Sequence, residues 1–249
     1  MTSQHGYRGL VAEAYDLHPP PYDDHAFYRE RIEAADGPAL EIGSGTGRLL
    51  IPYLQASLHV EGVEPSDEML AICHEKAAAA DVVATVHQQY AQELNLPGRY
   101  ATIYIPVSSF QLIDSLEDAR TALVRFHQHL APGGQLLISL FIPQEELDSN
   151  NEWRLGRRLP REDGSIILIS HATRVHHDRQ VFRTTSKYEL FDREGLLQRT
   201  ELHSSSLRWY ERAQFHTMLE VAGYREIAST GEVAGGTGPD RLMMFRAVR

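Results

Sequence analysis

The chain has one cysteine, two tryptophans and no long apolar run among its 249 residues. A single cysteine, Cys73, excludes an intrachain disulfide and a cysteine-based zinc cluster, and it fits a reducing compartment. No segment has the length and apolarity of a membrane span, and the N-terminus lacks the basic and apolar regions of a signal peptide. We therefore expect a cytoplasmic protein with no membrane partner.

Positive charge is also scarce. The chain has 24 Lys and Arg residues against 34 Asp and Glu residues, which gives a net charge of −10. Proteins that bind nucleic acid normally present a basic face, so we expect no nucleic-acid partner and a small-molecule ligand instead. None of the 13 histidines has a spacing typical of a metal site, and no metal is expected.

Residues 37–145 alternate between apolar segments and amphipathic segments. We expect strands at residues 40–42, 59–63, 84–87, 102–107 and 135–142, and helices that begin at Arg48, Asp67 and Leu116. This alternation predicts an α/β fold with a doubly wound sheet. The same organisation resumes at residues 211–249, where the pattern predicts a helix over 211–221 and strands over 224–228 and 241–248.

Two segments stand outside this alternation. Residues 1–36 contain two short predicted helices, 7–15 and 25–35, which three consecutive prolines keep apart, and such a segment can act as a lid. Residues 146–210 change to the period of strands, with turn-forming residues at regular spacing. Sixty residues of strand are too many for an ordinary loop, so we expect an inserted antiparallel sheet of four strands.

The most informative segment is a turn with three glycines, Gly43, Gly45 and Gly47, directly after the first predicted strand. Glycines let backbone amides approach a ligand without a Cβ clash, and the following helix presents its N-terminus to it. The next strand ends in Glu64, 21 positions after Gly43, where a carboxylate can accept hydrogen bonds from both hydroxyls of a ribose. The pattern predicts a site for a nucleoside cofactor.

The identity of the nucleoside depends on two positions in this motif. Arg48 stands where the dinucleotide fingerprint has its last glycine, so the match to an NAD site is imperfect. Glu41, two residues before the first glycine, would repel a pyrophosphate and suits a cationic ligand better. The run from Glu41 to Gly47, followed by Val-Glu-Gly-Val-Glu64-Pro-Ser-Asp-Glu-Met69, resembles the class I S-adenosylmethionine-dependent methyltransferases.

The resemblance covers most of the chain, with further matches at 94–100 and 130–137. It implies a Rossmann-like sheet of seven strands with a reversed last strand, and S-adenosylmethionine as the cofactor. The glycine turn would pass under the methionyl part, Glu64 would hold the ribose, and Tyr90 and Ala91 would border the adenine. Many relatives have an acidic residue in place of Tyr90, so Gln89 or backbone carbonyls would accept the bond from the adenine amino group.

The resemblance and the strand ends together define a candidate cofactor site. Its members are Tyr15, Tyr28, Glu41, Gly43, Ser44, Gly45, Gly47, Arg48, Glu64, Pro65, Met69, Gln89, Tyr90, Ala91 and Pro106. Alternatives stay open for four of them. Glu41 either caps amides of the turn or pairs with the cofactor ammonium. Tyr15 and Tyr28 are either lid aromatics or packing residues, and Arg48 is either a partner of the cofactor carboxylate or solvated.

Candidate acceptor contacts follow the fourth and fifth strands and occur in the insertion. They are Ser108, Ser109, Phe110, Phe141, Trp153, Tyr188 and Trp209. The aromatic members of the insertion suit stacking on a planar acceptor, although a sheet also needs such residues to pack one face. We therefore expect residues 146–210 to cover an acceptor site, with a small-molecule methyl acceptor as the partner.

Methyl transfer from a sulfonium is an in-line displacement, so a protein must align the acceptor, exclude water and handle one proton. His171 and His203, in the predicted strands of the insertion, are the candidate bases. Because no convincing base stands beside the fourth strand, transfer to the nitrogen of an amine or heterocycle is favoured. An O-methyltransferase of a phenolic metabolite, an NAD-dependent oxidoreductase and a non-catalytic cofactor-binding partner protein are the alternatives. The oligomeric state stays open.

Overall fold

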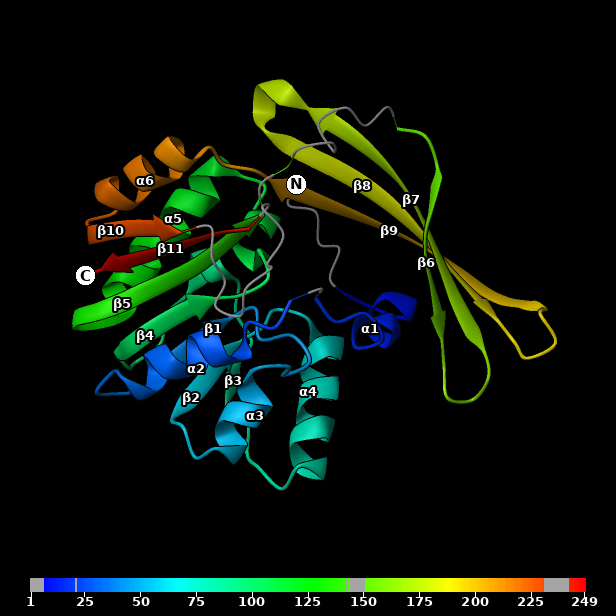
Figure 1. Cartoon of the computed structure of the whole chain (residues 1–249), viewed down its shortest axis with the longest axis horizontal. Helices are drawn as coiled ribbons and strands as arrows, with labels where there is room; N and C mark the ends of the chain where they lie inside the picture. Colours follow the sequence, from blue (N-terminus) through cyan, green and yellow to red (C-terminus); the bar gives the residue numbers. More distant parts are fainter. Residues whose placement is uncertain (1–6, 21, 142, 144–150, 231–241) are drawn as a thin grey trace.

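A computed structural model describes residues 7–20, 22–141, 143, 151–230 and 242–249. Its strands form two separate sheets (Figure 1). The larger sheet has seven strands in the order β10-β11-β5-β4-β1-β2-β3. These are β1 (Ala39–Ile42), β2 (Val60–Val63), β3 (Val86–His87), β4 (Tyr100–Ile105), β5 (Leu130–Phe141), β10 (Arg225–Thr230) and β11 (Leu242–Val248). β11 is antiparallel to both of its neighbours, so the expected reversed last strand is confirmed.

Helices cover both faces of this sheet. They are α2 (His25–Glu33), α3 (Leu50–Gln55), α4 (Asp67–Ala79), α5 (Leu116–His129) and α6 (Arg212–Val221). A further helix, α1 (Leu10–Tyr15), packs on the smaller sheet, and the short 3-10 turns are η1 (Ala91–Glu93), η2 (Ser109–Leu112) and η4 (His177–Arg179). One apolar cluster joins α5 and α6 to the sheet, and a second joins α2, α3 and α4 to its other face. The predicted doubly wound α/β architecture is confirmed.

The alternation of side chains along β1 decides where its one carboxylate points. Leu40 and Ile42 pack in the cluster that contains α5 and α6, whereas Ala39 packs in the cluster that contains α2 and α3. Successive side chains of a strand point to opposite faces, so Glu41 shares the face of Ala39. A buried carboxylate therefore lies under α2 and α3, directly before the glycine turn.

The smaller sheet is the predicted four-stranded insertion. β6 (Arg154–Pro160), β7 (Ile166–His176), β8 (Val181–Phe191) and β9 (Leu197–Arg208) form an antiparallel meander in that order. Figure 1 shows this sheet projecting from the seven-stranded core, with α1 near its lower part. Leu10 and Ala14 of α1 pack against Leu159 and Ile167, which anchors one face of the sheet to the N-terminal segment.

Some boundaries differ from those that the pattern predicts. The first helix begins at Leu10 instead of residue 7, because Gly9 has a φ of +54° and its N–H bonds to the side chain of Glu68 at 2.6 Å. The fifth strand begins at Leu130, since its pairing with β4 extends back to Tyr100 across a register shift. Among the described residues, no helix has both the length and the apolarity to cross a membrane.

Candidate active site

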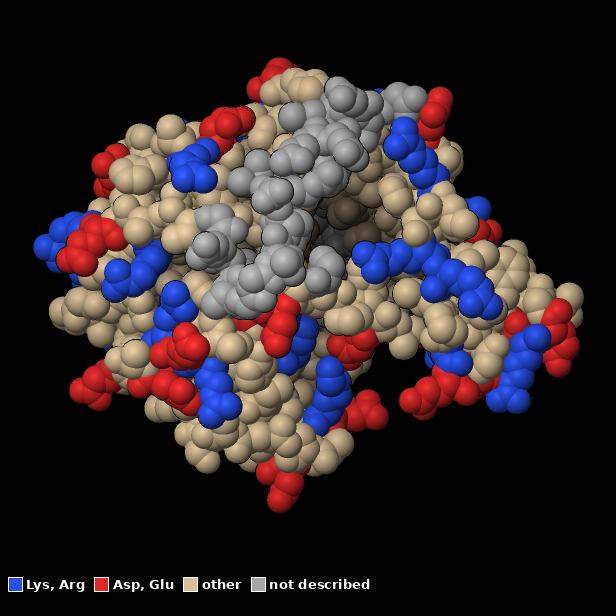
Figure 2. Space-filling view, in the orientation of Figure 1, with Lys and Arg blue, Asp and Glu red and all other residues tan. Residues whose placement is uncertain are grey.

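A cavity of about 590 Å³ opens between the carboxyl ends of the parallel strands and the inserted sheet. Figure 2 shows a hollow on this face of the molecule, beside the inserted sheet. Six parts of the chain contribute its walls: the N-terminal segment, the glycine turn, the residues after β2, the residues around η1, the residues around η2, and β9. The wall from β9 consists of His203, Ser204, Ser205 and Ser206. Both sheets therefore share one cavity.

The glycine turn has a backbone that only glycine adopts without strain. Gly43, Gly45 and Gly47 have φ values of +73°, +56° and +84°. A Cβ on Gly47 would lie 2.7 Å from the Cδ1 atom of Ile51 and 2.9 Å from the Sγ atom of Cys73. Left-handed φ values and close approach both exclude larger side chains, so the turn keeps an open backbone facing the cavity at Gly43 and Gly45.

Glu64 completes the turn. Its Oε2 atom accepts a hydrogen bond from the N–H of Gly45 at 3.1 Å, and its Oε1 atom accepts one from the N–H of Ser66 at 2.9 Å. Burial raises the pKa of this carboxyl, and the two backbone bonds oppose that effect. A carboxylate fixed in this way, beside bare glycine backbone, suits the paired hydroxyls of a ribose.

Comparison with known proteins identifies the family. Residues 39–134 match the model of a methyltransferase domain. An uncharacterized methyltransferase of Bacillus cytotoxicus is 32% identical over 174 residues, which are 68% of this chain and 79% of that protein. The chain belongs to the class I S-adenosylmethionine-dependent methyltransferases. Their cofactor is S-adenosylmethionine.

Solved structures of methyltransferases have the same fold. The CcbJ methyltransferase from Streptomyces caelestis superposes with a TM-score of 0.78 at 22% identity, covering 99% of this chain and 98% of that one. An amino pentose methyltransferase from Micromonospora echinaspora, CalS10, gives 0.72 at 23% identity, covering 98% of each chain. At such identities, the likeness establishes the architecture, including the inserted sheet.

The cavity of this methyltransferase fits the cofactor on its own chemistry. The turn offers backbone where any Cβ on Gly43 would approach within 3.1 Å of Ser109, and Glu64 offers a fixed acceptor. Pro65, Met69, Gln89, Tyr90 and Ala91 all line the same cavity, as the resemblance implies. Tyr90 is 43% exposed. Among the described residues, no cluster of three or more His, Cys, Asp and Glu side chains is arranged to hold a metal.

Gln89, the proposed acceptor for the adenine amino group, is engaged within its own loop. Its Oε1 atom accepts the N–H of Asn95 at 2.8 Å, and its Nε2 atom donates to the carbonyl of the same residue at 3.3 Å. The amide therefore stiffens the loop beside η1. This pairing favours backbone carbonyls over Gln89 as partners of an adenine amino group.

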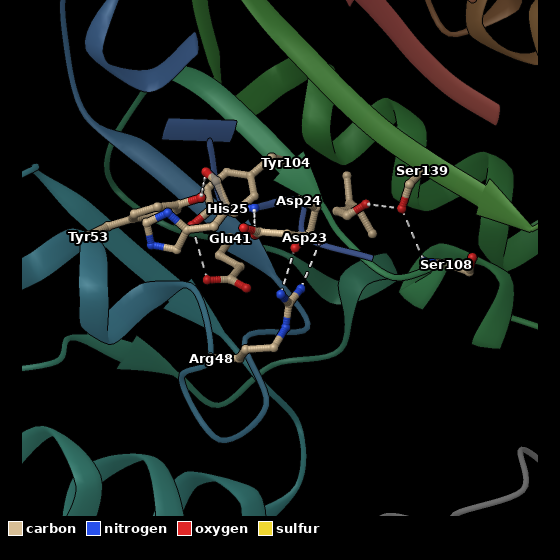
Figure 3. Close-up of polar contacts among 10 residues, drawn as sticks. Asp23, Asp24, His25, Glu41, Arg48, Tyr53, Tyr104, Ser108 and Ser139 are labelled. Atoms are coloured by element: carbon tan, nitrogen blue, oxygen red, sulfur yellow. Dashed lines mark hydrogen bonds and ion pairs between the residues drawn. The ribbon is translucent and has the colours of Figure 1, made fainter. Parts of the chain in front are cut away.

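Glu41 and Arg48 do not line the cavity and belong to a polar cluster in which Glu41 and Asp24 are buried and Arg48 is half-buried (Figure 3). Arg48 donates to both carboxylate oxygens of Asp24, at 2.6 and 2.9 Å, and Tyr104 donates to Glu41 at 3.0 Å. Glu41 is only 2% exposed, and this burial raises its pKa to about 8, although Arg48 and Tyr104 act in the opposite direction. Arg48 is thus occupied by Asp24, which sequence analysis did not consider.

Several other predicted cofactor residues lie outside the cavity walls. Tyr28 is fully buried and packs on Tyr104, with ring centroids 5.1 Å apart. Ser44 and Pro106 are buried, and neither they nor Tyr28 line the cavity. Of the two predicted lid aromatics, Tyr15 alone reaches the cavity.

The acceptor candidates also divide into residues that line the cavity and residues that pack elsewhere. Ser109 lines the cavity, whereas Phe110 packs on Phe126, Tyr210 and Phe215 in the core. Ser108 is held by a bond from its N–H to the Oγ atom of Ser139 at 3.2 Å (Figure 3).

Four aromatic candidates lie outside the cavity walls. Phe141 exchanges backbone bonds with the side chain of Gln111. Trp209 packs on Phe182, Tyr188 packs beside α1, and Trp153 is 53% exposed. None of these aromatics lines the cavity.

The two candidate bases occupy one row of the inserted sheet. His171 pairs with Ser186, which pairs with His203, so both histidines lie on the same face, two strand spacings or about 9–10 Å apart. His203 lines the cavity, but His171 does not, and a Cβ on Gly156 of β6 would meet its ring at 2.8 Å. The geometry brings only His203 to the site.

Sequence analysis missed Tyr7. Its ring lies between Tyr15 and His203, at centroid distances of 5.4 and 5.9 Å, and its carbonyl accepts a hydrogen bond from the Oγ atom of Ser66 at 2.8 Å. Burial raises the pKa of Tyr7, so its hydroxyl stays protonated. No local pattern marks this residue, because it precedes the first helix and its neighbours come from distant parts of the chain.

Proposed function

We propose that this methyltransferase transfers the methyl group of S-adenosylmethionine to the nitrogen of an amine on a small molecule. The observation that carries the proposal is the charge of the shared cavity. Its lining includes five carboxylates, Glu64, Asp67, Glu93, Asp114 and Asp118, against one guanidinium, Arg8. An excess of negative charge in a concave site attracts cations, which suits an ammonium acceptor as well as the sulfonium cofactor.

Asp114 is the carboxylate best placed to meet the acceptor. Its backbone carbonyl accepts hydrogen bonds from the Arg208 guanidinium at 2.9 and 2.7 Å, which tie this loop to the end of β9. His203 lies on β9 itself, and both residues line the cavity. In this proposal, Asp114 attracts the ammonium form, and His203 takes the proton that the amine must lose before it attacks.

The cofactor supplies an electrophilic methyl group on a sulfonium centre. Glu64 is proposed to hold the ribose, the backbone of Gly43 and Gly45 to lie against the methionyl part, and Tyr90 and Ala91 to border the adenine. Tyr7 and Tyr15 close the cavity on the N-terminal side and exclude water from the reacting groups. We assign residues 1–36 to a lid, residues 37–145 and 211–249 to the cofactor domain, and residues 146–210 to the acceptor cover.

Two relatives support transfer to nitrogen. The chain is 23% identical over 188 residues to a dTDP-3-amino-3,4,6-trideoxy-alpha-D-glucopyranose N,N-dimethyltransferase of Streptomyces venezuelae. It is 28% identical over 144 residues to a second sugar N,N-dimethyltransferase, from Streptomyces fradiae. These relatives make amino sugars the first amines to test.

The test is a screen with isotopically labelled S-adenosylmethionine against matched amine and phenol acceptors, read by mass spectrometry. We expect labelled products from amines and none from phenols, with an Asp114→Asn variant raising the KM for the amine and a His203→Ala variant lowering kcat. Asp178→Asn, an exposed carboxylate in the turn between β7 and β8, is the matched control. Methylation of phenols alone would contradict the proposal.

A further inference from the structure

Asp16 closes a small polar triangle outside the cavity. It is the residue that directly follows α1, and its carboxylate accepts hydrogen bonds from the Oγ1 atom of Thr46 at 2.6 Å and from the Nζ atom of Lys76 at 2.9 Å. The ammonium of Lys76 also lies 3.4 Å from the Thr46 hydroxyl. Three distant parts of the chain, the end of α1, the glycine turn and the last turn of α4, therefore meet at one carboxylate.

The triangle stands beside the cofactor site without entering it. Asp16, Thr46 and Lys76 do not line the cavity, but two residues directly before them do: Tyr15 precedes Asp16, and Gly45 precedes Thr46. A Cβ placed on Gly45 would lie 3.7 Å from the Tyr15 ring and hydroxyl. Tyr15 and Gly45 therefore lie next to each other, and each directly precedes one member of the hydrogen-bonded pair Asp16 and Thr46.

We propose that Asp16 is a positioning residue for the cofactor, which fixes the ring of Tyr15 over the backbone of Gly45. Thr46 is fully buried, and a hydrogen bond to a carboxylate is stronger and shorter than one between neutral groups. The hydrogen bond between Thr46 and Asp16 is therefore the contact that holds the end of α1 against the glycine turn. Asp16 acts through Tyr15 and does not touch the cofactor. The inference rests on the cofactor assignment and is independent of which acceptor the enzyme uses.

The contacts of Asp16 contribute little to the stability of the fold. The side chains of Asp16 and Lys76 are 42% and 40% exposed, and ion pairs of such exposure contribute little to stability. α1 is docked on the inserted sheet by other contacts, the apolar side chains of Leu10 and Ala14 and the ion pair of Glu13 with Arg199. Loss of the Asp16 carboxylate should therefore leave α1 in place and release only its C-terminal end, which carries Tyr15.

The experiment is a double-mutant cycle on the binding of S-adenosylhomocysteine, measured by calorimetry on the full chain. This probe lacks the sulfonium charge, so removing a carboxylate cannot act through simple attraction of that cation. We expect Asp16→Ala to raise Kd about tenfold while the unfolding midpoint moves by only a few degrees. In a Tyr15→Ala background, the same substitution should change Kd by less than about twofold, because the residue through which it acts is already absent.

Three variants sharpen the result. Thr46→Val removes the hydroxyl at constant shape and should weaken binding as Asp16→Ala does, whereas Asp16→Asn keeps an acceptor for Thr46 and should recover part of the affinity. Asp23→Ala is the matched control, because that carboxylate lies in the same segment, accepts the N–H of His25 at 2.9 Å and does not line the cofactor cavity. Unchanged binding by Asp16→Ala, or losses that add in the double variant, would overturn the inference. A wild-type protein that fails to bind S-adenosylhomocysteine would overturn the cofactor assignment with it, whereas absence of transfer to amines would affect the proposed function alone.

Discussion

The cofactor half and the inserted sheet build the same cavity by different physical means. On the cofactor side, part of the wall is backbone, at Gly43 and Gly45 with their positive φ values, and the Glu64 carboxylate beside it is bonded to two N–H groups. In the inserted sheet, the wall is side chains on a regular strand, His203 to Ser206 of β9. A backbone wall tolerates almost no substitution, whereas a side-chain wall can change its chemistry and keep its fold.

Charge separates the two regions as well. Residues 151–210 contain eleven of the 24 Lys and Arg residues but only eight of the 34 Asp and Glu residues, so the inserted region is net positive and the rest of the chain is strongly negative. Figure 2 shows basic side chains gathered over the inserted sheet. Glu13 of α1 pairs with Arg161 and Arg199 of the sheet, at 3.4 and 2.5 Å. Opposite charge thus helps to hold the two regions around the cavity.

The largest expected effect comes from the glycine turn. Gly47 and Gly195 have nearly equal φ values, +84° and +83°, but a Cβ would clash at Gly47 and would meet nothing within 4 Å at Gly195, in the turn between β8 and β9. Gly47→Ala should lower the free energy of unfolding by roughly 2–5 kcal/mol and abolish binding of S-adenosylhomocysteine, because steric overlap adds to backbone strain. Gly195→Ala should cost only about 1–2 kcal/mol and leave binding intact. Denaturant unfolding and calorimetry measure both, and equal losses for the two variants would contradict the account of the backbone wall.

The next effect concerns the carboxylate of that wall. Glu64→Gln keeps the size of the side chain but removes one acceptor of the pair, and it should weaken binding of S-adenosylhomocysteine by about 1.5–3 kcal/mol, or roughly 10- to 150-fold. The matched control in the inserted sheet is Glu189→Gln, whose carboxylate pairs with Lys187 at 3.0 Å away from the cavity. We expect unchanged binding for the control, measured by calorimetry at one pH. A comparable loss in the control would mean that the sheet contributes to the cofactor site.

The next effect in size is the pH dependence of the free energy of unfolding, which should differ between variants in the two regions. The pKa of Glu41 is raised from its ordinary value of 4.5 to about 8, so the folded state holds a proton that the unfolded state has released. The contribution of Glu41 to the free energy of unfolding is therefore fully present below about pH 4.5. It falls by on the order of a few kcal/mol as the pH rises toward 8. Glu41→Gln should flatten the fall in unfolding free energy between pH 5 and pH 8, and Glu194→Gln, in the turn between β8 and β9, should leave the slope unchanged. Urea unfolding at several pH values is the measurement, and an unaltered slope in Glu41→Gln would exclude this carboxyl as the cause.

The contrast between the glycine turn and the inserted sheet also explains which parts of the site the sequence predicted. The glycine turn and Glu64 are local features, because each glycine and its spacing encode a backbone conformation, and both lie on the cavity where expected. The four strands of the insertion were equally visible as a pattern. Alternation alone could not tell which residues of the sheet meet the cavity, so it selected His171 and His203 alike although only His203 lines it.

Other parts of the site depend on contacts between distant segments. The pairing of Arg48 with Asp24 joins residues 24 positions apart, and Asp16 reaches Thr46 and Lys76 across 30 and 60 positions. Tyr7 lies against His203, which is on β9 of the inserted sheet. No periodicity records such partners, so these residues became visible only when the N-terminal segment was placed over the turn.

The smallest expected effect tests the attraction between the two regions. Glu13→Gln removes the carboxylate that pairs with Arg161 and Arg199 but leaves the apolar contacts of Leu10 and Ala14. Exposed ion pairs contribute about 0–1 kcal/mol and are screened by salt, so the variant should unfold slightly more easily at low ionic strength and match the wild type in about 1 M NaCl. Unfolding at both salt concentrations measures this difference, with Glu30→Gln on α2, remote from the inserted sheet, as the control. A loss that persists in high salt would show that Glu13 holds the sheet by packing, and the two regions would then be joined by shape and not by charge.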